Sequence, residues 1–158
     1  MNSFTKYIKQ IVYGLGVVIV LLLLLLVTTN PQSDDNYLAR GKIIFDDVEF
    51  VVEIVDTPRL RTRGLSLREV LLPSYGMLFV FSGSDKHGFW MKDMLFPIDI
   101  IWFDNEFVVV DVKENLSPES YPQVFKPRVP ARFALEINIG GISDNEIVIG
   151  KKATYEGL

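Results

Sequence analysis

An uncharged, strongly apolar segment near the N-terminus constrains this chain more than any other feature. Residues 11–27 contain no charged side chain and include six consecutive leucines, residues 21–26. As a helix, this segment covers about 26 Å, and two following threonines extend it toward the hydrocarbon thickness of about 30 Å. Only a helix satisfies all its own backbone hydrogen bonds in lipid. We therefore predict a transmembrane helix over residues 11–29.

The charges on either side of this segment predict its orientation. Lys6 and Lys9 precede it, and no charge follows it before Asp34. Because basic residues stay on the cytoplasmic side, residues 1–10 are expected in the cytoplasm and the rest of the chain outside the cell membrane. A cleaved secretory signal has the same basic start, but its apolar core is about 7 to 15 residues long and ends in small residues. A retained, single-pass signal anchor is favoured here.

The rest of the chain has the length of one domain. Residues 30–37 form a polar linker, and residues 38–158 are predicted to form a single extracytoplasmic domain. The net charge of −4, without a basic stripe, argues against nucleic acid as a partner, because such binding depends on neutralising phosphates. The sequence contains no cysteine, so packing and not disulfides must stabilise the domain.

Apolar patterns predict a mainly β domain. Residues 48–54 largely alternate between apolar and polar side chains, and a tight turn at Asp46 and Asp47 would pair them with residues 42–45. Residues 77–81 are apolar throughout, which is typical of a strand covered on both faces. Further strands are predicted at residues 88–91, 98–103, 107–113, 133–138, 146–149 and 153–155. Seven or eight short strands indicate a compact β-sandwich or partly closed barrel.

Capping signals add one or two short helices to this β domain. Thr57 can cap a helix that begins at Pro58 and ends at Gly64. Ser66 and Glu69 have the spacing of a capping box, which predicts a second short turn of helix.

Five short motifs occur in one order along the domain. They are Arg63-Gly64-Leu65, Gly76-Met77-Leu78-Phe79, Phe89-Trp90-Met91-Lys92, Pro97-Ile98-Asp99-Ile100 and Leu135-Glu136. Together they resemble the family known as domain of unknown function 192, over the chain from Arg40 to the C-terminus. The resemblance implies a compact, mostly β domain that is often found behind a signal or anchor in bacteria and archaea. It implies no established activity.

Two positions depart from the pattern of that family. Ser66 stands where the family usually has methionine, and Lys92-Asp93-Met94 stands where it has Lys-Asn-Thr. A polar pocket that relied on that Asn and Thr would be altered here. If those groups bind a ligand elsewhere in the family, this chain is expected to bind a different one or none.

Asp99 and Glu136 are the first candidate site residues. Asp99 lies in the apolar run 98–103, where an unpaired buried carboxylate is costly. We expect it to be exposed at the strand end or paired with Arg63 or Lys92. Glu136 allows the same two interpretations, a structural ion pair or a functional carboxylate. Two carboxylates in different environments can also act as acid and base, although nothing in the spacing requires these two to meet.

Trp90 and Lys92 are the second candidate pair. On a strand both would point to one face, and an indole beside an ammonium can hold a sugar ring or an anion. The plainer interpretation is that the aromatic residues around Trp90 belong to the core, with Lys92 at its edge.

Four arginines close together form a basic cluster. They are Arg59, Arg61, Arg63 and Arg68. Near a bilayer such a cluster can bind an anionic polymer or lipid headgroups. A solvated helix whose last arginines complement its dipole is the simpler interpretation.

The residue inventory argues against common catalytic and metal sites. His87 is the only histidine, which excludes multi-histidine metal sites and leaves one base for a serine hydrolase. Ser82, Ser84 and Asp85 lie nearby, but a polar loop explains them more simply. The sequence has neither a P-loop nor a dinucleotide-binding glycine pattern. We therefore name no catalytic residue, metal ligand or cofactor.

These observations favour a membrane-anchored extracytoplasmic domain that binds a polar or anionic envelope ligand, either a small molecule or a glycan. Its lipid contact would be residues 11–29. The predicted ligand-binding residues are Arg63, Trp90, Lys92, Asp99 and Glu136. One alternative is a hydrolase of envelope polymers that uses Asp99 and Glu136. The other is a scaffolding module that binds partners through a sheet edge or the proline-rich segment 114–132.

Overall fold

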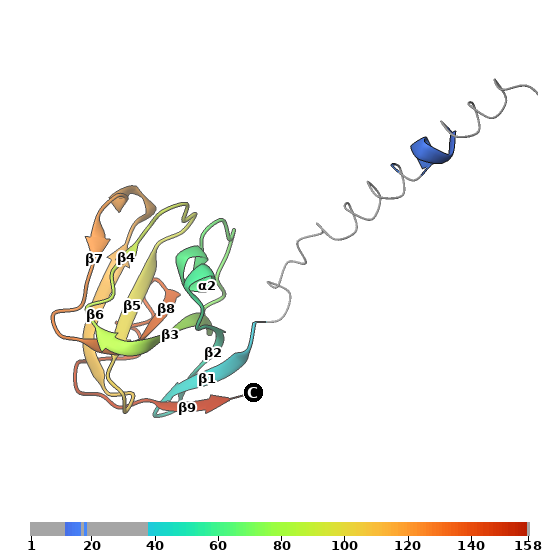
Figure 1. Cartoon of the computed structure of the whole chain (residues 1–158). Coiled ribbons are helices and arrows are strands. Elements are labelled where there is room, and N and C mark those ends of the chain that lie inside the picture. The colour runs from blue at the N-terminus through green and yellow to red at the C-terminus, as the bar shows by residue number, and fades with distance from the viewer. Residues whose placement is uncertain (1–11, 17, 19–37, 158) are drawn as a thin grey trace, which may run out of the picture. The chain divides into compact units, whose positions relative to one another are not determined.

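The computed structural model describes residues 12–16, 18 and 38–157 (Figure 1). Residues 12–16 and 18 are helical, and among the described residues no helix is long and apolar enough to cross a membrane. The predicted transmembrane segment 11–29 lies mostly outside the described residues, and the linker 30–37 lies entirely outside them. Both stay predictions.

The domain from residue 38 onward is built mainly from strands. The strands are β1 (Arg40–Phe45), β2 (Val48–Val55), β3 (Tyr75–Asp85), β4 (Phe89–Trp90), β5 (Ile98–Phe103), β6 (Val109–Leu116), β7 (Val124–Phe125), β8 (Ala131–Asn138) and β9 (Thr154–Gly157). The helical elements of the domain are α2 (Pro58–Arg63) and the single 3-10 turn η2 (Pro118–Ser120). The predicted mainly β fold with one or two short helices is confirmed.

Seven strands form one sheet in the order β6-β5-β8-β3-β2-β1-β9 (Figure 1). β4 and β7 form a separate two-stranded sheet. The large sheet does not close into a barrel. Chain segments beside its two edge strands are nevertheless joined, because the Val109 N–H donates to the Lys151 carbonyl (2.9 Å) and the Ala153 N–H to the Phe107 carbonyl (2.9 Å). The predicted compact β-sandwich or partly closed barrel is thus a mainly β fold without a closed barrel, in which backbone hydrogen bonds join the start of β6 to the segment before β9.

The first hairpin and the central strand follow the sequence pattern. β1 and β2 pair antiparallel with Phe45 opposite Val48, as predicted. Asp46 has a φ of 50°, a left-handed conformation that aspartate tolerates better than most residues and that suits a tight turn. β3 lies between β8 and β2, and its residues 77–79 are buried, which agrees with a strand covered on both faces.

Two predicted elements are wrong within the described domain. Residues 146–149 form no strand, because the chain turns there and the Ile147 N–H donates to the Ile142 carbonyl at 3.0 Å. Ser66 caps no helix, because its hydroxyl donates to the Lys92 carbonyl at 2.9 Å. At Ser66 a tertiary contact overrides the local pattern, whereas at residues 146–149 a local turn replaces the expected strand.

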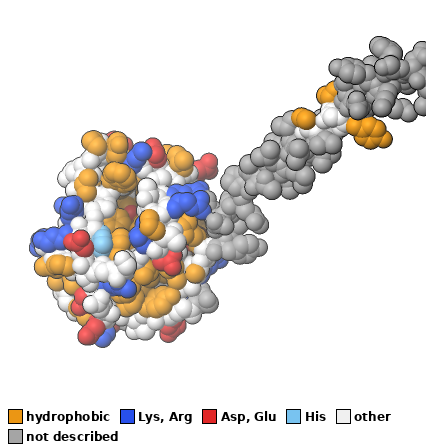
Figure 2. All heavy atoms as spheres, viewed as in Figure 1, with side chains coloured by type: hydrophobic (Ala, Val, Ile, Leu, Met, Phe, Trp, Pro, Cys, Tyr) orange, Lys and Arg blue, Asp and Glu red, His pale blue; other side chains and the backbone are white. Residues whose placement is uncertain are grey.

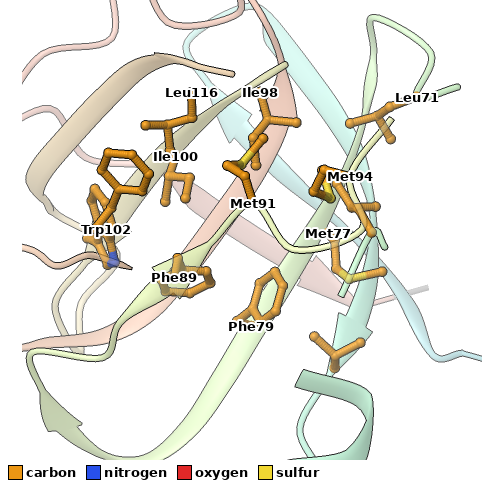
Figure 3. Packing of buried hydrophobic residues seen from close by; sticks show 14 of the residues in the cluster. Leu71, Met77, Phe79, Phe89, Met91, Met94, Ile98, Ile100, Trp102 and Leu116 are labelled. Carbon is orange, nitrogen blue, oxygen red and sulfur yellow. The ribbon is translucent and has the colours of Figure 1, made fainter. Parts of the chain in front are cut away.

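The large sheet packs hydrophobic side chains on both faces, since successive strand residues point to opposite sides. One face contributes Met77, Phe79, Ile98, Ile100 and Trp102 to a group that also contains Phe89 of β4, here called the β4 cluster. The other face contributes Ile43, Phe45, Leu78, Ile101 and Phe103 to a group that also contains Ile142 and Ile147, here called the C-terminal cluster. Figure 3 shows Phe89 of the β4 cluster between Phe79 and Trp102.

Candidate ligand-binding site

A pocket of about 320 Å³ lies beside α2 on the side of the β4 cluster. It is lined by Pro58, Arg61, Thr62, Arg63, Gly64, Leu65, Ser66, Phe79, Phe81, Gly88, Phe89, Trp90, Met94 and Glu136. The charged members come from α2 and β8, which lie far apart in the sequence. The fold therefore builds this pocket by bringing the short helix against the sheet.

Local sequence signals position α2 and its arginines. Thr57 caps the helix, because its side-chain oxygen accepts the Leu60 N–H at 3.3 Å. Gly64 ends the helix with a φ of 51°, a backbone conformation that glycine adopts more easily than other residues. The predicted helix is thus confirmed, and its last turn carries Arg61 and Arg63 to the pocket.

Neutral groups hold the Arg61 guanidinium in place. It donates to the Val80 carbonyl at 2.9 Å and to the Asp56 carbonyl, and it lies over the Phe81 ring at 5.1 Å from the centroid. These partners orient the cation without cancelling its charge. Arg61 therefore gives this wall of the pocket a fixed positive charge.

Glu136 contributes a buried carboxyl group to the lining of the pocket. It lies on β8 between Met77 of β3 and Ile100 of β5, and its Oε2 atom has no hydrogen-bond partner in the described part of the chain. Burial raises the pKa of Glu136 to about 8, although the positive charge of Arg68 acts in the other direction. Arg68 is itself ion-paired with Glu53. At neutral pH the Glu136 carboxyl therefore carries a proton and can both donate and accept a hydrogen bond.

Trp90 forms an aromatic part of the pocket lining. Its side chain is 47% exposed, while its neighbour Phe89 is buried in the β4 cluster. The Trp90 ring meets the Tyr121 ring edge to face, with centroids 6.4 Å apart. Trp90 therefore presents a flat apolar surface at the pocket. The interpretation of this aromatic segment as core holds for Phe89 and is wrong for Trp90.

Asp99 lies on the other face of the sheet from Glu136. Along β5 it alternates with residues of the β4 cluster, and it is fully buried. Its Oδ1 accepts the Asn115 N–H at 2.9 Å and its Oδ2 accepts the Ile142 N–H at 3.1 Å. The carboxylate thus ties the turn at Ile142 to β5 and also holds Asn115 near the end of β6.

Three of the five predicted site residues come together at the pocket, namely Arg63, Trp90 and Glu136. Lys92 is exposed and does not belong to the lining. The expectation that Asp99 is exposed or paired with Arg63 or Lys92 is wrong, because two backbone N–H groups satisfy it inside the fold. Asp99 and Glu136 cannot act together as acid and base from opposite faces. Ligand binding by the three pocket residues stays a prediction.

Sequence reasoning missed three polar residues of the lining, Arg61, Thr62 and Ser66. Arg61 belongs to the arginine cluster, but helical spacing alone pairs Arg59 with Arg63 and gives Arg61 no special place. Ser66 was predicted as a helix cap. The contacts of α2 with β3 and of Ser66 with Lys92 identify these residues.

The described residues offer no metal site, and charges of both signs share the face of the domain in Figure 2. Among the described residues no group of three or more His, Cys, Asp or Glu side chains could hold a metal ion. On the face of the domain in Figure 2, basic, acidic and hydrophobic side chains are interspersed. The only histidine, His87, stacks on Phe81 with centroids 3.6 Å apart.

Comparisons with known proteins find one family model and two similar solved structures. The model of a protein family described as DUF192, Uncharacterized ACR, matches residues 42–155. A crystal structure of a "putative transcription regulator" from Sinorhizobium meliloti 1021 is similar, with 27% identity, a TM-score of 0.67, and 77% of this chain and 94% of that chain covered. A protein of unknown function from Novosphingobium aromaticivorans DSM 12444 is also similar, with 26% identity, a TM-score of 0.66, and coverage of 73% and 83%. No curated protein matches the chain.

Proposed function

We propose that this protein, which belongs to the uncharacterised family DUF192, binds a small polar or anionic ligand in the pocket beside α2. The description of the family names no activity, so the proposal rests on the pocket. One observation carries the proposal: the buried Glu136 carboxyl has an oxygen without a partner in the described chain, and Glu136 lines a pocket together with Arg61. Buried polar atoms are nearly always hydrogen-bonded. A pocket lined by a buried polar atom without a partner is therefore a candidate ligand-binding site.

The charges of the lining favour an acidic ligand. A protonated Glu136 is neutral and can donate a hydrogen bond, while Arg61 presents a positive charge that its neutral partners do not cancel. A carboxylate or phosphate group accepts hydrogen bonds from both kinds of donor. The exposed ring of Trp90 suits an apolar or ring-shaped part of the same ligand.

The size and geometry of the pocket favour binding over catalysis. A volume of about 320 Å³ is at the lower end of the range for small-molecule sites. A carboxylate-assisted hydrolase would need a second carboxylate beside Glu136, and Asp99 lies on the other face of the sheet. The predicted anchor at residues 11–29 would place this ligand in the cell envelope.

Binding of small anions to the full chain in detergent tests the proposal. Acetate, succinate and glycerol 3-phosphate serve as acidic probes, and glycerol and glucose as neutral ones. We expect at least one acidic probe to raise the thermal unfolding midpoint, because a ligand of the folded state stabilises it. Calorimetric titration with that probe should show a loss of affinity of about tenfold in Arg61→Gln.

Lys152→Gln is the matched control, since it removes a positive charge from an exposed residue outside the pocket lining. It should bind the acidic probe as the unaltered chain does. Equal losses in the two variants, or no midpoint shift with any of the five probes, would show that the pocket is not the binding site.

A further inference from the structure

Two loops next to the pocket expose four large apolar side chains. The loop between α2 and β3 exposes Leu67 (71%), Val70 (66%) and Leu72 (55%), and the loop between β4 and β5 exposes Leu95 (58%). We call these four residues the leucine rim. Single exposed leucines are ordinary on a protein surface, but a group of them on adjoining loops marks an interaction site.

Hydrogen bonds hold the two loops against each other and against the sheet. The Leu67 N–H donates to the Asp93 carbonyl at 2.8 Å, and the Ser66 hydroxyl donates to the Lys92 carbonyl. The Asn138 amide of β8 donates to the Leu71 carbonyl at 3.0 Å. The four residues of the rim are therefore presented by a fixed backbone.

Neighbours of the rim residues point inward from the same loops. Leu65, Leu71, Met91 and Met94 are buried in the β4 cluster, and Figure 3 shows three of them, Leu71, Met91 and Met94, among the core side chains. The loops thus bury one set of apolar residues and present another set to the outside. Because the loops already pack their inward side chains on the core, the core cannot also cover the leucine rim.

Leu67 shows that this exposure has a conformational cost. Its φ is 62°, in the left-handed region that branched apolar residues rarely adopt. Glycine or asparagine would occupy this position more easily. A leucine that is both conformationally unfavourable and 71% exposed gains nothing from burial within its own domain.

The N-terminal sequence indicates what could cover the rim. The uncharged run 11–27 is followed by residues 28–37, ten residues that reach at most about 33 Å when extended. The domain begins at Leu38, which packs against the β4 cluster, the same cluster that the two loops cover. A bilayer entered by residues 11–27 would therefore be within reach of the rim.

The charges beside the rim suit a lipid surface. Arg68 is followed directly by Glu69, and Lys92 by Asp93, so the charges next to the exposed leucines have opposite signs in pairs. Apolar side chains between such pairs match the boundary between headgroups and acyl chains, where apolar and polar groups meet within a few ångströms.

We propose that the leucine rim inserts into the interfacial region of the bilayer that the N-terminal apolar run enters. This contact is separate from ligand binding in the pocket, and it rests on residues 11–27 acting as a membrane anchor. Only the apolar side chains of the two loops would leave water.

Single labels on the full chain test this proposal, and the absence of native cysteine makes the labelling specific. Leu67→Cys and Leu95→Cys each carry an environment-sensitive fluorophore, in phosphatidylcholine nanodiscs with one chain per disc. Val148→Cys is the control, because Val148 is also 61% exposed but lies next to Ile147 of the C-terminal cluster. We expect the labels at residues 67 and 95 to show a blue-shifted emission that a lipid-borne nitroxide quenches. The label at residue 148 should show neither effect.

Three outcomes would overturn the proposal. The first is equal water exposure of all three labels in single-chain discs. The second is protection of residues 67 and 95 that occurs only with several chains per disc, which would make the rim an interface between copies of this chain. The third is failure of the full chain to enter nanodiscs, which would remove the anchor on which the proposal rests.

Discussion

Two buried carboxyl groups on neighbouring strands, Asp99 of β5 and Glu136 of β8, have opposite surroundings. Asp99 accepts two backbone N–H groups, one on each oxygen. Glu136 has an oxygen without a partner in the described chain, lines a pocket, and has a pKa raised by burial to about 8. The two residues lie one ladder position apart on these paired strands, because Asp99 pairs with Ile137 and Glu136 pairs with Ile100. Their side chains therefore point to opposite faces of the sheet.

This difference separates a structural acid from a candidate functional one. A carboxylate whose two oxygens each accept a backbone N–H contributes to folding, and Asp99 does not line the pocket. Burial without a partner destabilises the charged form of a carboxyl, and the unpaired oxygen can still bind a ligand. Burial alone would have treated Asp99 and Glu136 as equivalent.

The largest expected effect is on the pH dependence of stability, and it comes from Glu136. Below pH 4.5 the carboxyl is protonated in both the folded and the unfolded chain, whereas between pH 4.5 and about 8 only the folded chain keeps the proton. The free energy of unfolding should therefore fall as pH rises over this range, on the order of 1 kcal/mol per pH unit from this group. Glu136→Gln should lack this contribution. Urea unfolding at pH 5, 6, 7 and 8 measures the difference between the two proteins.

Exposed Glu156 provides the control for this experiment. Glu156→Gln should keep the pH dependence of the unaltered chain. If Glu136→Gln also keeps it, Glu136 is ionised in the folded protein and the contrast with Asp99 disappears.

A smaller effect, independent of the pocket, is expected at Asp99. Asp99→Ala leaves the N–H groups of Asn115 and Ile142 without their acceptor, so the free energy of unfolding should fall by about 2 kcal/mol. Urea unfolding at pH 7 measures the loss, and binding of the acidic probes should persist in the folded fraction. Asp47→Ala, at an exposed turn residue, should change stability by less than about 0.5 kcal/mol. An equally small change in Asp99→Ala would refute its structural role.

The smallest expected effect comes from Arg68, whose positive charge lowers the pKa of Glu136. Arg68→Met should therefore raise that pKa further, so that Glu136 keeps its proton to a higher pH. The carbon-13 resonance of the Glu136 carboxyl, followed by NMR titration, measures the shift. Stability at pH 7 should change by less than about 1 kcal/mol, since the ion pair with Glu53 is partly exposed. An unchanged or lower titration midpoint would show that Arg68 does not act on Glu136.

Much of the fold could be predicted because its signals are local. The alternation along residues 48–54 predicted β2, and the cap at Thr57 predicted α2. Two predictions failed, one because a distant group competes with the local pattern and the other because the chain turns locally. Ser66 bonds to Lys92 instead of capping a helix, and residues 146–149 are held in turns.

The candidate site was predictable only in part. Trp90 and Glu136 stand out in the sequence as an aromatic and an acidic residue in apolar surroundings, and both line the pocket. Asp99 stands out in the same way but serves the fold. Arg61 does not stand out among the arginines, although its position against Val80 and Phe81 makes it the fixed cation of the pocket.

The sequence by itself determined most of the strands, where α2 begins and ends, and which residues within a strand share a face. These properties depend on backbone geometry over a few residues. Only the tertiary structure decided that Glu136 meets a pocket while Asp99 meets two backbone N–H groups. That outcome depends on which strands pair, in which register, and on which loops cover each face, and no spacing along the chain contains this information.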